Sequence, residues 1–397
     1  MKDLSLYIHI PFCVRKCLYC DFLSFPVPSA SEQGEKHSYV NCTAAKPEVV
    51  ESYVNLLRQE IAAAAAQYEE YQVLSLFFGG GTPSLLPMGE VSRITDTVRR
   101  CYRVSENAEI TTEMNPDTVS EDKLREYITA GINRLSIGLQ SADDDELERI
   151  GRIHDYRSFA KAYETARRVG FRNINIDLMA ALPEQSVYSY ERTLRQAVSL
   201  APEHISAYSL TLEEGTPLYE LRERYRFPTE EEDREMYALT GEYLASCGYH
   251  RYEISNYALE GYECRHNKVY WQRGNYVGFG LGASSMTENV RWANPTDPEK
   301  YRDYVGRLCE SKNTSDRHIL TRREQMEEYM FLGLRMMCGV DIQEFENIFG
   351  IRMQTIYGGI IGKLREQGLL TQDRNRIKLT LKGIDVSNYV MAQFLLD

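Results

Sequence analysis

The chain has 397 residues, of which 43% are hydrophobic and 26% are charged, and its formal net charge is −12 at pH 7. This length and composition are typical of a soluble globular protein with one large domain and a smaller one. The acidic balance argues against a nucleic-acid coat protein or a polybasic membrane anchor, and no apolar run approaches the length of a membrane span.

Cysteine usage indicates a reducing compartment. Three of the nine cysteines lie close together near the start, and the other six are scattered singly. That distribution is not typical of a disulfide-linked scaffold. Met1 is followed by Lys2 and Asp3 and then by a strand-like segment, without the apolar core of a signal peptide. We therefore expect a cytoplasmic protein without an integral membrane segment.

Six short apolar or β-branched segments are predicted to be buried strands, because each ends at glycine, proline or polar residues. They are residues 4–10, 73–80, 109–115, 134–140, 174–182 and 204–212. Helical patterns separate them at 49–68, 88–102, 120–130, 156–170 and 188–200. This alternation predicts an α/β fold with a parallel sheet and right-handed crossovers, in which functional residues gather at the carboxyl ends of the strands.

The pattern changes in two places. Residues 25–48 are polar and proline-containing and are predicted to form an inserted loop. After residue 300, predicted helices at 319–337, 340–350 and 357–370 precede a strand pair at 376–383, an order that resembles a winged-helix module. We therefore expect a barrel-type domain at 1–300 and an α+β winged-helix-like module at 301–397. Its basic residues are mixed with acids, so we expect a lid or docking surface rather than nucleic-acid binding.

Cys13, Cys17 and Cys20 follow the first predicted strand directly, in the spacing C-x3-C-x2-C. Three thiolates on one short loop can each bind one iron of a cubane cluster and leave one iron open. A structural zinc site needs a fourth ligand at a pairing spacing, and Phe22 follows the last cysteine where one is expected. The alternative is three cysteines packed as small apolar side chains, which fits poorly with Arg15 in the same loop.

This loop, with Tyr19 before its last cysteine, resembles the radical S-adenosylmethionine superfamily. The resemblance implies a partial (β/α)6 TIM-like barrel and a [4Fe–4S] cluster on Cys13, Cys17 and Cys20, with S-adenosylmethionine bound at the open iron. In that superfamily, electron transfer from the cluster cleaves the sulfonium to a 5′-deoxyadenosyl radical. A flavodoxin- or ferredoxin-type electron donor is expected on the same ground.

Further motifs lie at the ends of the other predicted strands: FFGGGTPS, EMNP, GLQS and NIDLMAALP, with GRIHD shortly after GLQS. Three consecutive glycines allow a ligand to approach the backbone closely. Asp177 is an acid inside an apolar strand and needs a partner there, whereas Arg152 could equally be a solvated helix residue or a fork for a carboxylate. By motif match, the resemblance implies S-adenosylmethionine contacts at Tyr7, Tyr19, Gly80, Gly81, Thr82, Glu113, Gln140, Arg152 and Asp177.

The complete set of motifs, with LEEGTPLY, YEISNYA and GFGLGAS, resembles the HemW-type heme chaperone family. This implies a protein that binds heme and transfers it to acceptor apo-hemoproteins. HNKVYW (266–271) matches the string whose histidine is implicated in holding heme in that family, so His266 is the expected heme contact, with Tyr270 and Trp271 covering the macrocycle. Taken alone, His266 is better interpreted as a structural histidine. Cys264 is a candidate accessory thiol.

The alternative function is that of an oxygen-independent coproporphyrinogen III oxidase, which decarboxylates substrate propionates to vinyl groups. That enzyme resembles this chain through the barrel, but its pattern carries a further cysteine where Phe22 stands here. We therefore favour the chaperone. The inserted loop at 25–48 departs from the family pattern.

Overall fold

The computed structural model describes residues 1–26, 47–311 and 316–396. Its centre is a run of seven parallel strands in the order β11-β1-β4-β5-β6-β7-β8. These strands are β1 (Lys2–Ile10), β4 (Tyr71–Gly80), β5 (Val104–Met114), β6 (Arg134–Gln140), β7 (Ile174–Ala180), β8 (His204–Ser209) and β11 (Tyr276–Phe279). All six predicted strands are therefore confirmed as neighbours in one sheet, while β11 was not predicted.

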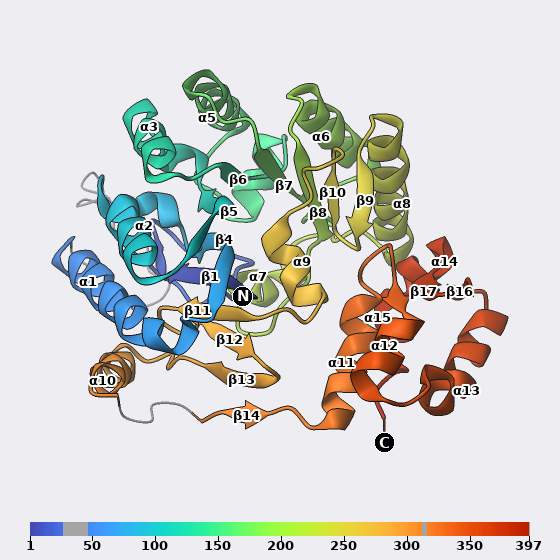
Figure 1. Cartoon of the computed structure of the whole chain (residues 1–397). Helices are drawn as coiled ribbons and strands as arrows, with labels where there is room; N and C mark the ends of the chain where they lie inside the picture. Colours follow the sequence, from blue (N-terminus) through green and yellow to red (C-terminus); the bar gives the residue numbers. More distant parts are fainter. Residues whose placement is uncertain (27–46, 312–315, 397) are drawn as a thin grey trace.

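Helices cover the outer side of this curved sheet (Figure 1). They are α1 (Pro47–Ala64), α2 (Glu90–Cys101), α3 (Glu121–Ala130), α5 (Tyr156–Val169), α6 (Val187–Ser199) and α8 (Glu230–Ser246). Ser120 caps α3 by accepting a hydrogen bond from Lys123 N, and Gly131 ends it in a left-handed conformation. The fold is thus a partial TIM-like barrel, as predicted, with its apolar core between the sheet and these helices.

Antiparallel strands extend the sheet beyond both ends of the parallel run, so the barrel stays open. β10 (Asn256–Ala258) and β9 (His250–Glu253) follow β8, and β12 (Ser284–Thr287), β13 (Val290–Ala293) and β14 (His318–Ile319) follow β11. The remaining elements of this part are β2 (Phe12–Cys13), β3 (Phe25–Pro26), α4 (Asp144–Arg149), α7 (Pro217–Glu220), α9 (Arg265–Trp271), α10 (Pro298–Cys309) and 3₁₀ turns at Ala65–Tyr68, Pro83–Leu85, Pro116–Thr118 and Arg222–Arg224.

The C-terminal part has its own apolar core around Phe345, Tyr357 and Phe394. Its elements are α11 (Arg322–Gly333), β15 (Val340–Asp341), α12 (Ile342–Phe349), α13 (Met353–Glu366), β16 (Leu370–Gln372), β17 (Arg376–Leu379), α14 (Leu381–Asp385) and α15 (Ser387–Ala392). The strands form a small antiparallel sheet in the order β15-β17-β16. This is the predicted winged-helix-like arrangement, except that the strand pair expected at 376–383 is formed by β16 and β17, and α14 begins at Leu381.

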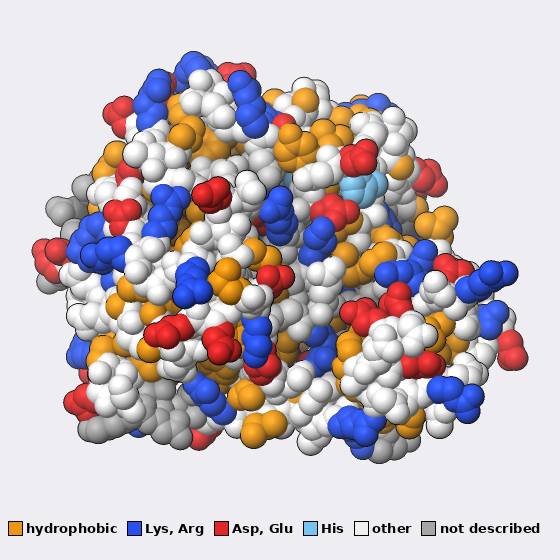
Figure 2. Space-filling view, in the orientation of Figure 1, with side chains coloured by type: hydrophobic (Ala, Val, Ile, Leu, Met, Phe, Trp, Pro, Cys, Tyr) orange, Lys and Arg blue, Asp and Glu red, His pale blue; other side chains and the backbone are white. Residues whose placement is uncertain are grey.

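The division into residues 1–300 and 301–397 stays a prediction, and α10, which spans residue 300, packs on α1. Most of the predicted loop at 25–48 lies outside the described residues. No helix in the described ranges is both long and apolar enough to cross a bilayer. Basic and acidic side chains are mixed over the face in Figure 2, without a single basic patch on that face.

Candidate functional site

The cysteine loop leaves the carboxyl end of β1 and meets one side chain from the end of β4 and one from the segment after α4. Thr82 Oγ1 donates a hydrogen bond to Cys13 Sγ at 3.6 Å, and Arg152 Nη1 donates one to Cys17 Sγ at 3.6 Å. Cys20 N donates to Cys17 O at 3.2 Å, which turns the chain between the last two thiols. The loop predicted to hold the cluster is therefore in contact with two residues predicted to bind S-adenosylmethionine.

Backbone hydrogen bonds fix this loop to the segment after β6. Leu18 N donates to Ile150 O at 3.0 Å, and Arg15 Nη2 donates to Gly151 O at 3.0 Å. Gly151 has φ +75°, and a Cβ on it would lie 2.8 Å from Leu18 Cγ. Only glycine suits this approach, which explains the glycine of the GRIHD motif.

Burial raises the pKa of the Cys13 thiol, and it raises that of Cys20 to about 11. A raised pKa means that ionising these thiols costs free energy. Bound iron would offset that cost, because a thiol ligates metal as the thiolate. Among the described residues, no group of three or more His, Cys, Asp or Glu side chains is arranged to hold a single metal ion. A cubane cluster places each thiolate on a different iron, so its ligands need not converge on one point.

The glycine turn after β4 lies directly against the cysteine loop. Gly81 N donates to Ile10 O at 2.8 Å, and Thr82 N donates to Phe12 O at 2.7 Å. A Cβ on Gly80 would lie 2.6 Å from the His9 ring, and one on Gly81 would lie 2.6 Å from Phe12 O. Side chains at these two positions would collide with the first strand and the start of the loop, so the glycines keep the turn in place.

Glu113 ends β5 beside this turn and accepts a hydrogen bond from Gly80 N at 3.2 Å. Burial, and secondarily the charge of Asp177, raise the pKa of the Glu113 carboxyl to about 8. The carboxyl therefore holds its proton near neutral pH in the ligand-free chain. A cationic group bound beside it would favour the ionised form.

Gln140 and Arg152 lie together near Cys17. Gln140 has φ +67° at the end of β6 and accepts a hydrogen bond from Tyr208 Oη at 3.4 Å. Arg152 Nη2 donates to Gly138 O at 3.1 Å, and its Nε donates to His154 Nδ1 at 3.3 Å. These contacts remove the alternative that Arg152 is a solvated helix residue.

Tyr19 packs among apolar side chains near Arg152 rather than in an open cavity. It contacts the small cluster of Ile150, Met179 and Leu182. Burial, and secondarily the charge of Cys17, raise the pKa of its phenol well above the usual value. Its hydroxyl therefore stays protonated in this environment.

Asp177 has the polar partners that its place in an apolar strand requires. Ser136 Oγ donates to Oδ2 at 3.1 Å, and Asn175 Nδ2 donates to Oδ1 at 2.8 Å. Asn175 Oδ1 is in turn hydrogen bonded to His204 Nδ1 at 2.6 Å, and His204 Nε2 to Tyr252 Oη at 2.9 Å. The interior of the barrel is therefore a connected polar network rather than an apolar core.

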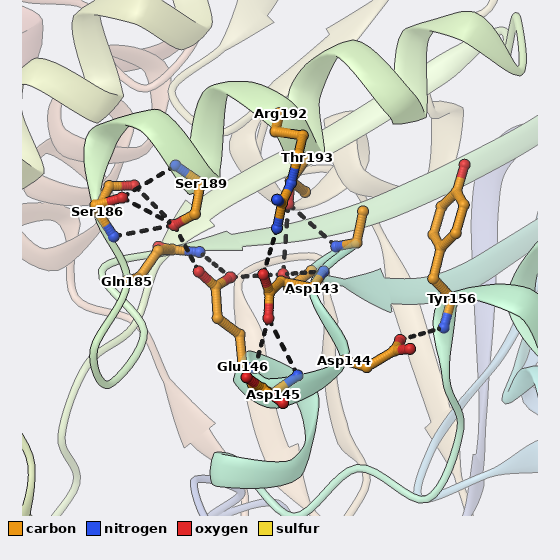
Figure 3. A network of polar contacts seen from close by, with 12 residues as sticks. Asp143, Asp144, Asp145, Glu146, Tyr156, Gln185, Ser186, Ser189, Arg192 and Thr193 are labelled. Atoms are coloured by element: carbon orange, nitrogen blue, oxygen red, sulfur yellow. Dashed lines mark hydrogen bonds and ion pairs between the residues drawn. The ribbon is translucent and has the colours of Figure 1, made fainter.

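A second network supports the loops after β6 and β7 (Figure 3). The Glu146 carboxylate is 3% exposed and accepts hydrogen bonds from Ser141 Oγ (2.6 Å), Gln185 Nε2 (2.9 Å) and Ser189 Oγ (2.7 Å). These donors come from the end of β6 and from the start of α6. The network joins the segment that carries Gln140 and Arg152 to the neighbouring strand's loop.

A cavity of about 430 Å³ opens between the carboxyl ends of the first strands and α9. Tyr7, Gly80 and Glu113, all predicted contacts, line it together with Tyr270, Tyr276 and the ring of Phe22, which is 65% exposed. Thr82, Gln140, Arg152 and Asp177 are tied to the surrounding loops and networks instead. The predicted residues thus share one end of the barrel, but they do not all face one cavity.

His266 lies on α9 and is 2% exposed. Its Nδ1 is hydrogen bonded to Ser75 Oγ at 2.9 Å and its Nε2 to Tyr270 Oη at 2.9 Å, while its ring stacks on Phe77 with centroids 5.0 Å apart. Burial lowers its pKa to about 3, so the ring is neutral. Ligation of iron by His266 would require Nε2 to exchange its Tyr270 partner for the metal.

The two aromatic residues expected to cover heme point to different places. Tyr270 lines the cavity with Tyr7, whereas Trp271 lines a separate cavity with residues of α11 and α15. Cys264 is fully buried and its thiol donates to Glu109 Oε1 at 3.5 Å. Glu109 also accepts hydrogen bonds from the backbone N–H groups of Arg265 and His266, so it caps the start of α9.

Sequence reasoning missed His9, His154 and Tyr208 as parts of this site. His9 Nδ1 is hydrogen bonded to Tyr7 Oη (3.1 Å) and His9 Nε2 to Leu23 O (2.9 Å). For Tyr208, the sequence did offer a signal: polar residues alternate along β8 at His204, Ser206 and Tyr208, and residues two apart share one face of a strand.

The chain matches two family models and several curated proteins. Residues 7–197 match the model of the Radical SAM superfamily, and residues 320–386 match that of the HemN C-terminal domain. The heme chaperone HemW of Escherichia coli strain K12 is 40% identical over 100% of this chain and 99% of its own length. HemW of Bacillus subtilis is 36% identical over 98% of this chain and 99% of its own.

The chain belongs to the HemW family. Its membership of the radical SAM superfamily implies a [4Fe–4S] cluster and S-adenosylmethionine. The solved structure of coproporphyrinogen III oxidase (HemN) from Escherichia coli superposes with a TM-score of 0.82, covering 99% of this chain and 90% of that one at 23% identity. That similarity confirms the fold of the described residues and leaves the reaction open.

Proposed function

We propose that this protein is a heme chaperone, which binds heme and transfers it to acceptor apo-hemoproteins. The observation that carries the proposal is similarity over the full length, including the C-terminal part, to curated proteins named as heme chaperones. Phe22 supports it, because an exposed ring stands where the oxidase's pattern carries a further cysteine, and the loss of that cysteine goes with the chaperone branch.

In this proposal Cys13, Cys17 and Cys20 hold a [4Fe–4S] cluster. The residues present fit that group: three thiols lie on one loop, glycines without side chains lie against it, and a guanidinium is hydrogen bonded to Cys17. The cluster supplies an open iron that binds S-adenosylmethionine and an electron for it. The positive charge of Arg152 stabilises the thiolate that the cluster requires.

The S-adenosylmethionine contacts are proposed for the residues that surround this loop. Glu113 offers a carboxylate to the ammonium group, and Asp177 offers acceptors to ribose hydroxyls. Arg152 pairs with a carboxylate, and the glycine turn lets the ligand approach the backbone closely. The proposed set is Tyr7, Tyr19, Gly80, Gly81, Thr82, Glu113, Gln140, Arg152 and Asp177.

The family motif implies a heme contact at His266, which would require Tyr270 to give up its hydrogen bond to Nε2. An acceptor apo-hemoprotein and a flavodoxin- or ferredoxin-type electron donor are its proposed partners. Both follow from the family.

The test is a pair of measurements on the anaerobically reconstituted full-length protein. In the first, heme is titrated and then offered to an apo-hemoprotein, and we expect about one heme per chain and its transfer. In the second, coproporphyrinogen III and S-adenosylmethionine are supplied together. Formation of protoporphyrinogen IX, without stable heme binding, would contradict the proposal and establish the oxidase.

A further inference from the structure

A second cavity, of about 390 Å³, lies where α9 meets the C-terminal helices α11 and α15. It is separate from the cavity beside Glu113, and no residue of the proposed cluster or S-adenosylmethionine site lines it. Its wall includes Trp271, Phe331, Leu332, Arg335, Met391 and Leu395. Apart from the guanidinium, the indole N–H and the amide of Asn388, which also lines the cavity, the lining side chains are apolar, and this combination suits a flat apolar ligand that carries an acid.

Two polar groups at this cavity have unused hydrogen-bonding capacity. The Arg335 guanidinium lies over the Trp271 ring, 4.2 Å from its centroid. Within the described part of the chain, Trp271 Nε1 and Arg335 Nε are buried atoms without a hydrogen-bond partner. Such donors cost stability unless an acceptor reaches them, and a carboxylate could accept from both. Another nitrogen of Arg335 lies 3.5 Å from the buried Glu253 carboxylate, which holds the guanidinium in place.

The geometry of α9 explains why one motif faces two cavities. His266 and Tyr270 are four residues apart and share the face toward the barrel, where they are hydrogen bonded to each other. Trp271 is one residue further and lies on another face of the helix. The last residue of HNKVYW therefore reaches the C-terminal helices, while the histidine stays in the barrel.

We propose that this second cavity, not the His266 side of α9, receives the edge of the heme macrocycle, with a propionate on Arg335 and Trp271 Nε1. This inference rests on the proposed function. A cavity of 390 Å³ is near the small end of the range for ligand sites. It therefore holds only one edge of the macrocycle and leaves the rest accessible to an acceptor protein. His266 then acts indirectly, by anchoring the helix that presents Trp271.

The test fills the cavity without removing a native contact of its polar groups. Ala392 lines the cavity from α15 and is exposed, so Ala392→Trp should block it while the chain still folds. Ala62→Trp, at an exposed position on α1, is the matched control. In anaerobic heme titrations followed by visible absorption, we expect Ala392→Trp to bind heme at least about tenfold more weakly, with iron content unchanged and the control like wild type.

A second pair of variants tests the polar groups. Trp271→Phe and Arg335→Lys remove the indole donor and the guanidinium fork, and each should weaken heme binding by about tenfold, as expected for a lost charge-assisted hydrogen bond. The chain offers its own control, because the other tryptophan, Trp292, also lies under an arginine, with Arg317 Cζ 4.8 Å from its ring centroid. Trp292→Phe and Arg317→Lys should leave heme affinity unchanged.

The outcomes separate this inference from the proposed function. If wild type binds no heme, the proposed function fails. If wild type binds heme and Ala392→Trp, Trp271→Phe and Arg335→Lys bind it equally well, the cavity is not the site. Loss of heme in His266→Ala, with full binding in Ala392→Trp and both variants still folded, would place heme on the barrel side of α9 and overturn the inference.

Discussion

Glu113 is the side chain whose charge decides how well a cationic ligand is held. Its carboxyl lies beside Gly80 at the end of β5, and burial raises its pKa to about 8. Below that value the ligand-free chain carries a proton there, whereas an ammonium group prefers the carboxylate. Binding therefore releases a proton, and affinity must rise as the pH rises toward 8.

We predict that the Kd for S-adenosylmethionine falls by about tenfold between about pH 6 and pH 7 in wild type, because one proton leaves on binding. Glu113→Gln should bind more weakly and without this slope. The exposed Glu148→Gln is the control and should keep it. Equilibrium dialysis across this range checks the prediction, and an equally steep slope in Glu113→Gln would show that another group titrates.

Substitution of His266 tests whether the histidine of the HNKVYW motif stabilises the fold or binds a ligand. Ser75 and Tyr270 occupy both ring nitrogens, and Phe77 stacks on the ring. We expect His266→Ala to lower the free energy of unfolding by about 2–4 kcal/mol without any heme, since it opens a cavity and removes the hydrogen-bond partner of the Tyr270 hydroxyl, while Ser75 keeps its bond to Ser5.

Urea unfolding of the heme-free protein measures this loss. The exposed His318, which pairs with Glu324 at the surface, is the matched position, and His318→Ala should cost less than about 1 kcal/mol. Unchanged stability of heme-free His266→Ala would mean that the ring contributes little to the fold and is free to serve iron.

At the scale of elements, the glycine turn after β4 and the cysteine loop form one unit. Gly81 lies so close to the loop that a Cβ would stand 2.6 Å from Phe12 O and 3.0 Å from Ile10 O, both backbone atoms. Backbone cannot move aside as a flexible side chain can. The turn therefore sets the position from which the loop presents Cys13.

We predict that Gly81→Ala shifts the start of the loop and lowers the iron retained after reconstitution to less than about half of the wild-type content. Gly362→Ala is the control, because Gly362 lies inside α13 and a Cβ added there would meet no atom within 4 Å outside its own helix backbone and chain neighbours. This control should stabilise the chain by about 0.5–1 kcal/mol. Full iron content in Gly81→Ala would show that the loop tolerates displacement.

The elements that were predicted correctly have a clear hydrophobic pattern or recognisable helix-capping residues within their own sequence. β1, β4 and β6 are each rich in apolar residues with few polar interruptions, and α3 carries both a serine cap and a glycine stop. β11 has only four residues and depends on pairing with β1, so its short run gave no signal. Pairing across the whole length of the chain is a tertiary effect that local patterns do not encode.

The same distinction applies to the site. Clustered cysteines, consecutive glycines and an acid in an apolar strand are chemically unusual, and they therefore marked the site residues in the sequence. The Glu146 network has no comparable signal, because its serine and glutamine partners are ordinary in loops. That Tyr270 and Trp271 face different cavities follows from where α9 lies between the barrel and the C-terminal helices (Figure 1), which the motif alone does not fix.

For the whole molecule, the C-terminal part matters through its attachment to the barrel. Met337 N donates to Tyr252 O at 3.0 Å, and Arg335 pairs with the fully buried Glu253. Tyr252 is also hydrogen bonded to His204, which connects through Asn175 to Asp177. A continuous chain of contacts thus joins the proposed S-adenosylmethionine site to the proposed heme cavity.

The central claim is that three thiols at the carboxyl edge of the sheet hold a cluster with one open iron. Anaerobic reconstitution followed by iron and sulfide analysis, with electron paramagnetic resonance of the reduced protein, tests it most directly. We predict about four irons and four sulfides per chain, a signal that S-adenosylmethionine alters, and loss of both iron and signal in the variant with Cys13, Cys17 and Cys20 replaced by alanine. Bound zinc in wild type, or undiminished iron and sulfide in that variant, would contradict the account.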